Sequence, residues 1–218
     1  NEDVAVTSTA TELNLLDGAT VVIPAKVEGT NFTGSLLVGH ATTGTLSSAE
    51  HNTGVGTTAL RSLTTGDKNT MLGNGAGTAI TTSAENTAVG RNALRFVATG
   101  GGRNTAIGVD ALASSDTSLT ENTAVGRTAL TACTGDVNTA IGYSAGANIT
   151  SGSGNVMIGE VNADSATGDR QLKITGNDGS TSTTWISGDS NGQVKLISGY
   201  IAEVALTDAS TITWNAAT

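Results

Sequence analysis

A five-residue phrase, Asn86-Thr87-Ala88-Val89-Gly90, recurs through most of this chain and constrains its fold more than any other feature. Related phrases begin at Asn52, Asn69, Asn104, Asn122, Asn138 and Asn155, at steps of 17, 17, 18, 18, 16 and 17 residues. A near-constant period of this size predicts an array of like units, each stacked on the next.

Aligned on their asparagines, the units show columns of constant chemistry. A β-branched residue, nearly always threonine, follows each asparagine, and Val, Ile or Leu stands two places later. The fourth place is always glycine, the seventh is alanine in six of seven units, and the eighth is leucine or glycine in six of seven units. This alternation predicts a short strand with Thr and Val/Ile on one face and the Ala88-type residue on the other. The glycine ends the strand where a positive φ or a close approach is needed, and the Ala-Leu pair predicts a tight turn or a single helical turn.

A single unit of this size buries too little apolar surface to be stable alone, so it depends on the units above and below. Aromatic residues are only 3% of the sequence, against 29 glycines, which indicates a thin core or one shared between chains. At a strand spacing of about 4.8 Å, eight coils make a rod roughly 38 Å long. We expect the asparagines to stack at one corner and bond along the array.

The composition of the chain also limits the kinds of partner that it can bind. The formal charge of -9 and the scattered Lys and Arg residues disfavour nucleic acid as a partner, because phosphate binding needs clustered cations. No apolar run approaches the roughly 18 residues of a membrane span, so we expect no membrane insertion. Cys133 is the only cysteine, which rules out an intrachain disulfide. The chain reads as a segment of a longer polypeptide.

The regions on either side of the array have their own patterns. In the N-terminal connector, residues 1–34, Thr9 and Glu12 have capping-box spacing and predict a helix of about two turns ending at Gly18. Val21-Val22-Ile23 predicts a strand. Ser35-Leu36-Leu37-Val38-Gly39 reads as a degenerate first coil. After the array, residues 165–218 predict short strands around the segments 172–174, 184–186, 194–197 and 201–204, with turns at 177–179 and 189–192.

These phrases resemble known fibrous proteins. Thr9-Ala10-Thr11-Glu12-Leu13-Asn14-Leu15-Leu16-Asp17-Gly18 resembles modules of phage tail fibres, especially those of marine and cyanobacterial phages. The Asn-Thr-Ala-Val-Gly array resembles the head repeats of trimeric autotransporter adhesins, and its Ala-Leu ending is closer to phage tail-fibre arrays. The run from Leu172 to Val194 resembles a module that follows such arrays. The resemblance implies a parallel β-roll in each chain and a homotrimeric fibre.

No residue stands out as catalytic or metal-binding. His40 and His51 occupy variable columns without a predicted partner. Cys133 shares its column with Leu63, Ile80, Val97 and Ile149, so we expect a small core residue rather than a nucleophile. The segment 73–78 matches neither a GxGxxG nor a Walker pattern, and its glycines belong to repeat columns. We therefore expect no cofactor and no metal.

Two further alternatives concern the surface. A glycosidase needs two carboxylates about 5–10 Å apart; the acids of the array stand at differing loop offsets, and we interpret them as solvated charges: Asp67, Glu85, Asp110, Asp116, Glu121 and Asp136. The threonine column resembles the ladder of ice-binding solenoids, but Val/Ile shares its face, so we expect it inside the protein or at a contact between chains. We interpret the loops carrying Arg91, Arg95, Arg103 and Arg127 as a solvated face, and the alternative is that a surface ligand touches the array at these loops.

The sequence thus predicts an all-β fibrous homotrimer: a connector over 1–34, a β-roll array over 35–164 with coils of about 17 residues, and an intertwined strand-rich segment over 165–218. The function we expect is that of a structural segment of a phage tail fibre, in the virion and extracellular, which presents or contributes to host-surface attachment without enzymatic activity. Its expected partners are its own copies, other tail or virion proteins, and a host-surface glycan or protein. A bacterial trimeric adhesin passenger and a glycan-degrading tailspike are the alternatives.

Overall fold

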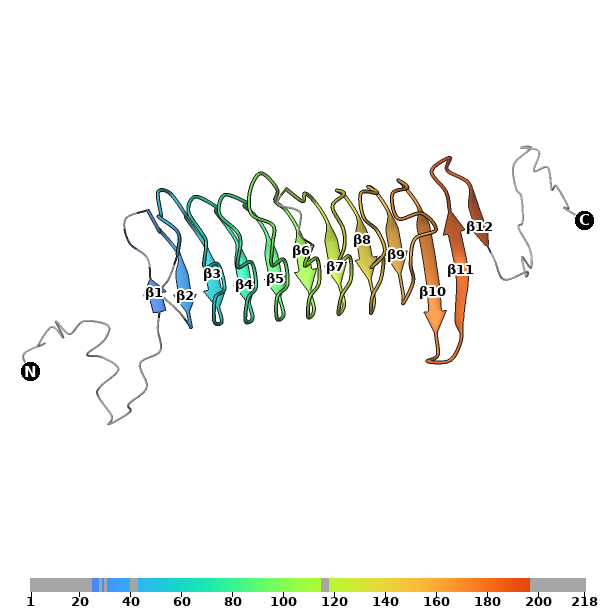
Figure 1. Cartoon of the computed structure of the whole chain (residues 1–218), viewed down its shortest axis with the longest axis horizontal. Coiled ribbons are helices and arrows are strands. Elements are labelled where there is room, and N and C mark those ends of the chain that lie inside the picture. The colour runs from blue at the N-terminus through green and yellow to red at the C-terminus, as the bar shows by residue number, and fades with distance from the viewer. Residues whose placement is uncertain (1–24, 28, 30, 40–42, 115–117, 197–218) are drawn as a thin grey trace, which may run out of the picture.

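The computed structural model describes residues 25–27, 29, 31–39, 43–114 and 118–196. Within these ranges the chain is all-β and forms a single rod of stacked coils (Figure 1). The predicted helix near the N-terminus, the predicted strand at 21–23 and the predicted strand at 201–204 lie outside the described residues, as do His40 and Asp116.

Twelve strands of the described residues form one sheet in sequence order. Their bounds are β1 Ala25–Val27, β2 Leu36–Val38, β3 Thr53–Val55, β4 Thr70–Leu72, β5 Thr87–Val89, β6 Thr105–Ile107, β7 Thr123–Val125, β8 Thr139–Ile141, β9 Val156–Ile158, β10 Leu172–Asn177, β11 Ser182–Gly188 and β12 Val194–Leu196. Strands β2 to β10 pair in parallel, each with the next, while β1 at one end and β11 and β12 at the other pair antiparallel. The chain is therefore a β-solenoid of about eight turns.

The register of the array follows the repeat. Thr53 pairs with Thr70, Thr70 with Thr87, and Thr87 with Thr105, so each repeat column becomes a straight row along the rod. The degenerate first coil is confirmed, because β2 pairs in parallel with β3. The parallel pairing continues past residue 164 by one coil, since Leu172 of β10 pairs with Val156 of β9. After β10 the sheet continues as two antiparallel strands.

The predicted alternation within each strand is confirmed. The central residue of every array strand is buried, as Ala88, Ala106, Ala124 and Ala140 illustrate, while its two neighbours are half-buried or exposed. Opposite these central residues lie the alanine and leucine of the turn and the apolar column of Cys133, all fully buried: Ala59, Ala93, Ala111, Ala129, Leu60, Leu94, Leu112, Leu130, Leu63, Ile80, Val97 and Ile149. A single chain thus encloses its own thin core.

Side-chain volumes in this core compensate one another. Where the strand carries Met71, the turn of the same coil carries Gly77, and a Cβ at Gly77 would lie 2.8 Å from the methionine sulfur. Where Leu37 fills the first coil, its neighbour in β3 is Gly54, whose Cβ would lie 2.4 Å from a leucine methyl. Close packing of this kind leaves little room for change in either partner.

The Ala-Leu pair forms a tight turn. Its leucines have positive φ, between 48° and 55° at Leu60, Leu94, Leu112 and Leu130. This conformation is uncommon for a residue with a side chain. It is held by burial of the leucine and by a hydrogen bond from its N–H to the alanine carbonyl of the next coil, for example Leu94 to Ala111 at 3.0 Å.

The glycine that follows each array strand is required because the next coil approaches its backbone closely. Gly90 has φ +135°, and a Cβ there would lie 2.4 Å from the carbonyl oxygen of Gly108 in the next coil. The same contact recurs at Gly56, Gly73, Gly108 and Gly126. The prediction of positive φ and close approach at this column is confirmed, and the glycines set how closely successive turns stack.

Candidate functional site

An asparagine ladder runs through the interior of the rod. The Oδ1 atom of Asn69 accepts a hydrogen bond from the backbone N–H of Asn86 at 3.1 Å and from its side-chain amide at 3.0 Å. The side-chain amide of Asn69 in turn donates to Oδ1 of Asn52 and to the carbonyl of Ser83, both at 3.0 Å. All seven asparagines are buried, so each coil depends on its neighbour to satisfy buried polar groups. The predicted stacking of asparagines is confirmed.

Two residues outside the Asn-Thr-Ala-Val-Gly pattern end this ladder. At the first coil the Ser35 hydroxyl accepts the backbone N–H of Asn52 at 2.8 Å. At the last coil Gln171 takes the place of an asparagine and donates to Asn155 Oδ1. Its side-chain amide also donates to the carbonyls of Ser165 and Gly168, each at 2.8 Å. The ladder therefore spans the whole solenoid.

The outward side chains of the parallel strands form a continuous surface, here called the Thr/Val face. It consists of a threonine row and an aliphatic row: Thr53, Thr70, Thr87, Thr105, Thr123 and Thr139, and Val55, Leu72, Val89, Ile107, Val125, Ile141 and Ile158. Both rows are half-buried or exposed in the single chain, with Leu72 48% and Ile141 42% exposed. Of the two expected places for the threonines, the interior of the chain is excluded, and a contact between chains stays a prediction.

The arginines singled out in the sequence lie on exposed parts of the rod but do not form one cluster. Arg91 pairs with Asp110 at 3.0 Å, and Arg103 pairs with Glu121 at 2.9 Å at the opposite end of the strands. Arg95 lies over the ring of Phe96, 4.8 Å from its centroid, and Arg127 lies over Tyr143 at 5.7 Å. Each ion pair joins side chains of two adjacent coils. Exposed ion pairs of this kind contribute little to stability.

Five of the six acids considered in the sequence analysis are described, and each bonds to a residue of a neighbouring coil. Asp67 accepts the backbone N–H of Glu50 at 2.7 Å, and Asp136 accepts that of Thr120 at 2.8 Å. Glu85, Asp110 and Glu121 pair with Lys68, Arg91 and Arg103. Each of these carboxylates therefore has a structural role in linking neighbouring coils.

His51 and Cys133 lie in different environments, the first at the surface and the second in the core. His51 is exposed at φ 56°, in the column that also holds Lys68, Glu85, Arg103, Glu121 and Val137, all at positive φ. Cys133 is fully buried, as predicted, and its sulfur lies 3.3 Å from both the Gly135 carbonyl and the Asn138 amide. In the described part of the chain, no three His, Cys, Asp or Glu side chains group as a possible metal site.

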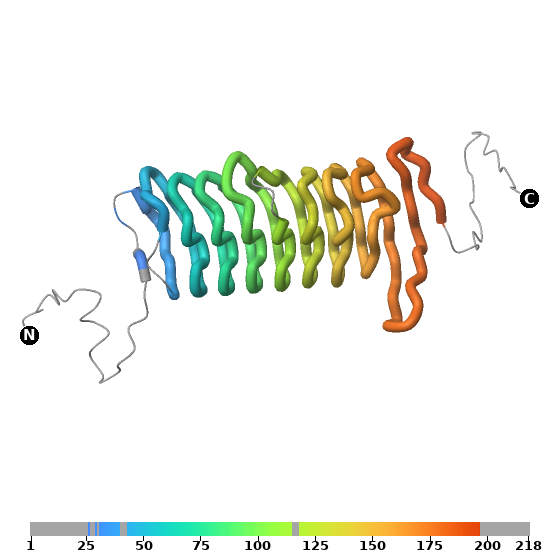
Figure 2. The backbone as a smooth tube through the Cα atoms, viewed as in Figure 1, coloured from blue at the N-terminus to red at the C-terminus, as the bar shows by residue number. Residues whose placement is uncertain are grey.

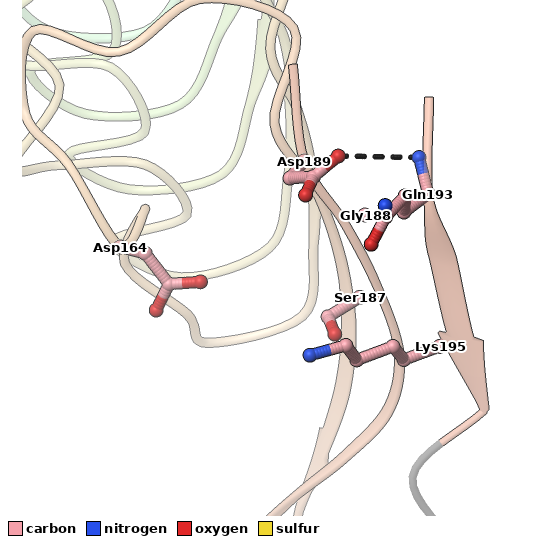
Figure 3. A pocket seen from close by; sticks show the side chains of 6 residues that line it. All are labelled: Asp164, Ser187, Gly188, Asp189, Gln193 and Lys195. Carbon is pink, nitrogen blue, oxygen red and sulfur yellow. Dashed lines mark hydrogen bonds between the residues drawn. The ribbon is translucent and has the colours of Figure 1, made fainter. Parts of the chain in front are cut away.

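A small polar pocket of about 110 Å³ lies where the last coil meets β11 and β12. Figure 3 shows Asp164 across this pocket from Ser187 and Lys195. Both carboxylates here have structural partners: Asp164 pairs with Lys173, and Asp189 accepts the backbone N–H of Gln193 at 3.1 Å to close a turn.

A second and larger groove, of about 460 Å³, lies on the β10–β11 hairpin. Its lining is Gly176, Asn177, Asp178, Thr181, Thr183 and Trp185. Sequence reasoning placed Trp185 on a strand and residues 177–179 in a turn. The strand is confirmed, and the turn is confirmed for Asp178 and Gly179, whereas Asn177 is the last residue of β10. It did not identify the groove, because an irregularity in the pairing of β10 and β11 brings these residues together.

Comparison of the chain with protein-family models, with curated proteins and with solved structures gives no match. Within the described residues, no helix has the length and apolar character to cross a bilayer.

Proposed function

We propose that this chain is a structural segment of a phage tail fibre, in which three copies associate side by side along the rod. In this role it belongs to the virion, works outside the cell, and presents or contributes to attachment at the host surface. Its work is mechanical and adhesive, with no bond made or broken. Its partners are its own copies, neighbouring tail proteins, and a host-surface glycan or protein.

The observation that carries this proposal is the Thr/Val face. The face runs the length of the solenoid, and its aliphatic row leaves side chains such as Ile107 (40%) and Leu72 (48%) exposed. A continuous exposed apolar strip on a protein surface marks an interaction site. Since the core is already closed within one chain, the strip is not needed for the fold of that chain, and packing against copies of itself would bury it.

The build of the rod suits a load-bearing segment. Each turn is tied to the next by the strand pairing, by the Asn ladder and by bonds at the Ala-Leu turns. Eight turns at about 4.8 Å each give a stiff spacer roughly 38 Å long. The sequence resemblance to tail-fibre arrays and to trimeric adhesin heads supports a three-fold arrangement of such rods.

Two measurements test the proposal. Native mass of the whole chain tests the association of three copies. Antibodies raised against the chain, viewed by immunogold electron microscopy, test its place. Label on the tails of phage particles supports the tail fibre, whereas label on the surface of uninfected bacteria supports the adhesin passenger and overturns the phage assignment. Release of reducing sugar from host capsule by the purified chain would favour the tailspike.

A further inference from the structure

The groove on the β10–β11 hairpin is lined by an exposed tryptophan and several polar side chains, which a purely structural rod does not require. Trp185 is 51% exposed, although large aromatic side chains usually bury most of their surface. Around it stand an amide, a carboxylate and two threonine hydroxyls, from Asn177, Asp178, Thr181 and Thr183. An indole ring beside several hydrogen-bonding groups matches the apolar and polar faces of a sugar ring.

The position of Trp185 results from an irregularity in the hairpin. Ile174 pairs with Ile186 and Thr175 pairs with Thr184, so Trp185 has no partner on β10. An extra residue in one strand is a β-bulge, which redirects a side chain and is common at functional sites.

The tryptophan ring lies directly over Gly176. A Cβ at Gly176 would lie 2.4 Å and 2.6 Å from two ring carbons of Trp185. Any larger residue at 176 would therefore move the ring. Gly176 allows the indole to rest on the backbone of β10, and the tryptophan stays half exposed at the groove.

The polar side of the groove is held in place before any ligand arrives. Asn177 donates to Glu160 Oε2 at 2.8 Å, which fastens the hairpin to the last turn of the array. One oxygen of Asp178 accepts the backbone N–H groups of Ser180 and Thr181, at 2.9 Å and 2.8 Å. These bonds lower the pKa of Asp178 below its ordinary value, so its carboxylate is ionised at neutral pH and acts as a hydrogen-bond acceptor.

The groove lies beyond the end of the Thr/Val face of the array, in the direction in which the strands run. Pairing between β9 and β10 ends at Ile158 and Ile174, so Gly176 and the turn beyond it extend past the end of β9. Figures 1 and 2 show this hairpin projecting beyond the coils. Packing of three chains along the array rows does not require this projecting part.

We propose that the hairpin groove binds a saccharide, with a pyranose ring stacked on Trp185 and its hydroxyls bonded to Asp178 and the two threonines. The acidic lining, with Asp178 and the adjoining Glu160, selects neutral or N-acetylated sugars over anionic ones. The inference deepens the proposed function, on which its attachment role rests, by naming the chemistry of a surface that the fibre would touch.

The experiment uses the full chain with Trp214→Phe, which leaves Trp185 as its single tryptophan. Cellotetraose, maltotetraose and triacetylchitotriose are titrated to about 10 mM while Trp185 fluorescence and the NMR signal of its indole N–H are followed, a range suited to millimolar affinity. We expect the Trp185 fluorescence and the indole N–H signal to change in a saturable way with at least one of the sugars. Gly176→Ala, followed through the same indole signals, is expected to weaken binding about tenfold or more. Trp185→Ala removes the reporter, so its binding is followed by saturation-transfer NMR of the sugar protons and is expected to weaken by the same factor. Phe96→Ala, which removes an exposed aromatic elsewhere, is expected to leave binding unchanged.

Absence of saturable change with all three sugars overturns the saccharide site. An indole that is shielded from quencher, with emission that shifts on dilution of the protein, also overturns it, because Trp185 would then lie between chains. Native mass recorded on the same samples separates the two proposals: loss of sugar binding in an intact trimer refutes only the saccharide site, and sugar binding by a monomer refutes only the assembly.

Discussion

The side-chain oxygen of Asn155 accepts two hydrogen bonds from Gln171, one from its backbone N–H at 2.8 Å and one from its side-chain amide at 3.2 Å. Gln171 thereby continues, with a different residue type, the ladder that six asparagine steps build before it. The ladder links one buried polar group per coil and makes the stability of each turn depend on its neighbours.

Substitution of Asn86 by Ala tests this dependence. The backbone and side-chain N–H groups of Asn104 would lose their shared acceptor, now 3.0 Å and 2.9 Å away. The side-chain amide keeps its bond to the Leu119 carbonyl through its other hydrogen. The backbone N–H and one amide hydrogen would then be buried without an acceptor, which costs about 3 kcal/mol of unfolding free energy. Chemical denaturation followed by circular dichroism measures the loss. Asn162→Ala, at an exposed asparagine, is the matched control, and an equal effect of both would contradict a special role for the ladder.

Substitution of Gly90 by Ala tests the spacing of the turns. Its Cβ would clash with the Gly108 carbonyl, in addition to adopting a positive φ. Gly179→Ala is the control, because Gly179 also has positive φ but no atom within 4 Å of a Cβ. We expect a loss of about 1 kcal/mol at Gly179 from the backbone alone and a much larger loss at Gly90. Similar melting temperatures for the two variants would refute steric control of the stacking.

A charge placed on the Thr/Val face tests its role as the contact between chains. Ile107→Lys places an ammonium at a position 40% exposed in the single chain. The variant is expected to keep its β circular dichroism and to lose its oligomeric mass in light scattering, since a buried charge without a partner opposes association. Val137→Lys, 54% exposed at a column that elsewhere carries Lys68 and Arg103, is expected to keep the mass of the unmodified chain.

The hairpin turn has a predicted pH dependence. Bonds from Thr181 and Ser180 lower the pKa of Asp178 below its ordinary 3.8. A carboxyl whose pKa is lower in the folded state stabilises the turn above its unfolded pKa, and this contribution is lost as the pH falls through the folded pKa. The amide NMR signals of Ser180 and Thr181 should therefore be constant at neutral pH and titrate below pH 3.8. In Asp178→Asn this step should disappear; if it persists, another group is responsible.

Much of this fold was accessible from the period alone. Because identical residues recur at Thr70, Thr87 and Thr105, a parallel in-register array was the simple way to pair them. The alternation of Thr87, Ala88 and Val89 indicated which side chain is buried. The apolar column that Cys133 shares with Leu63 and Ile80 also indicated that its side chain is buried.

Other features depend on contacts that the period does not encode. Ser35 and Gln171 end the Asn ladder, but their types differ from asparagine and only the pairing of the terminal coils shows their roles. The positive φ of Leu94 contradicts local preference and is sustained by burial and an inter-coil bond. The groove at Trp185 arises from a bulge, which is a property of two strands together.

The native mass of the intact 218-residue chain tests the central claim most directly. Light scattering or native mass spectrometry should give about three times the 21.5 kDa of one chain. The Ile107→Lys substitution should reduce this mass toward that of a single chain. A folded, stable monomer at micromolar concentration would contradict the account, because the Thr/Val face would then be a surface that the protein keeps exposed to water.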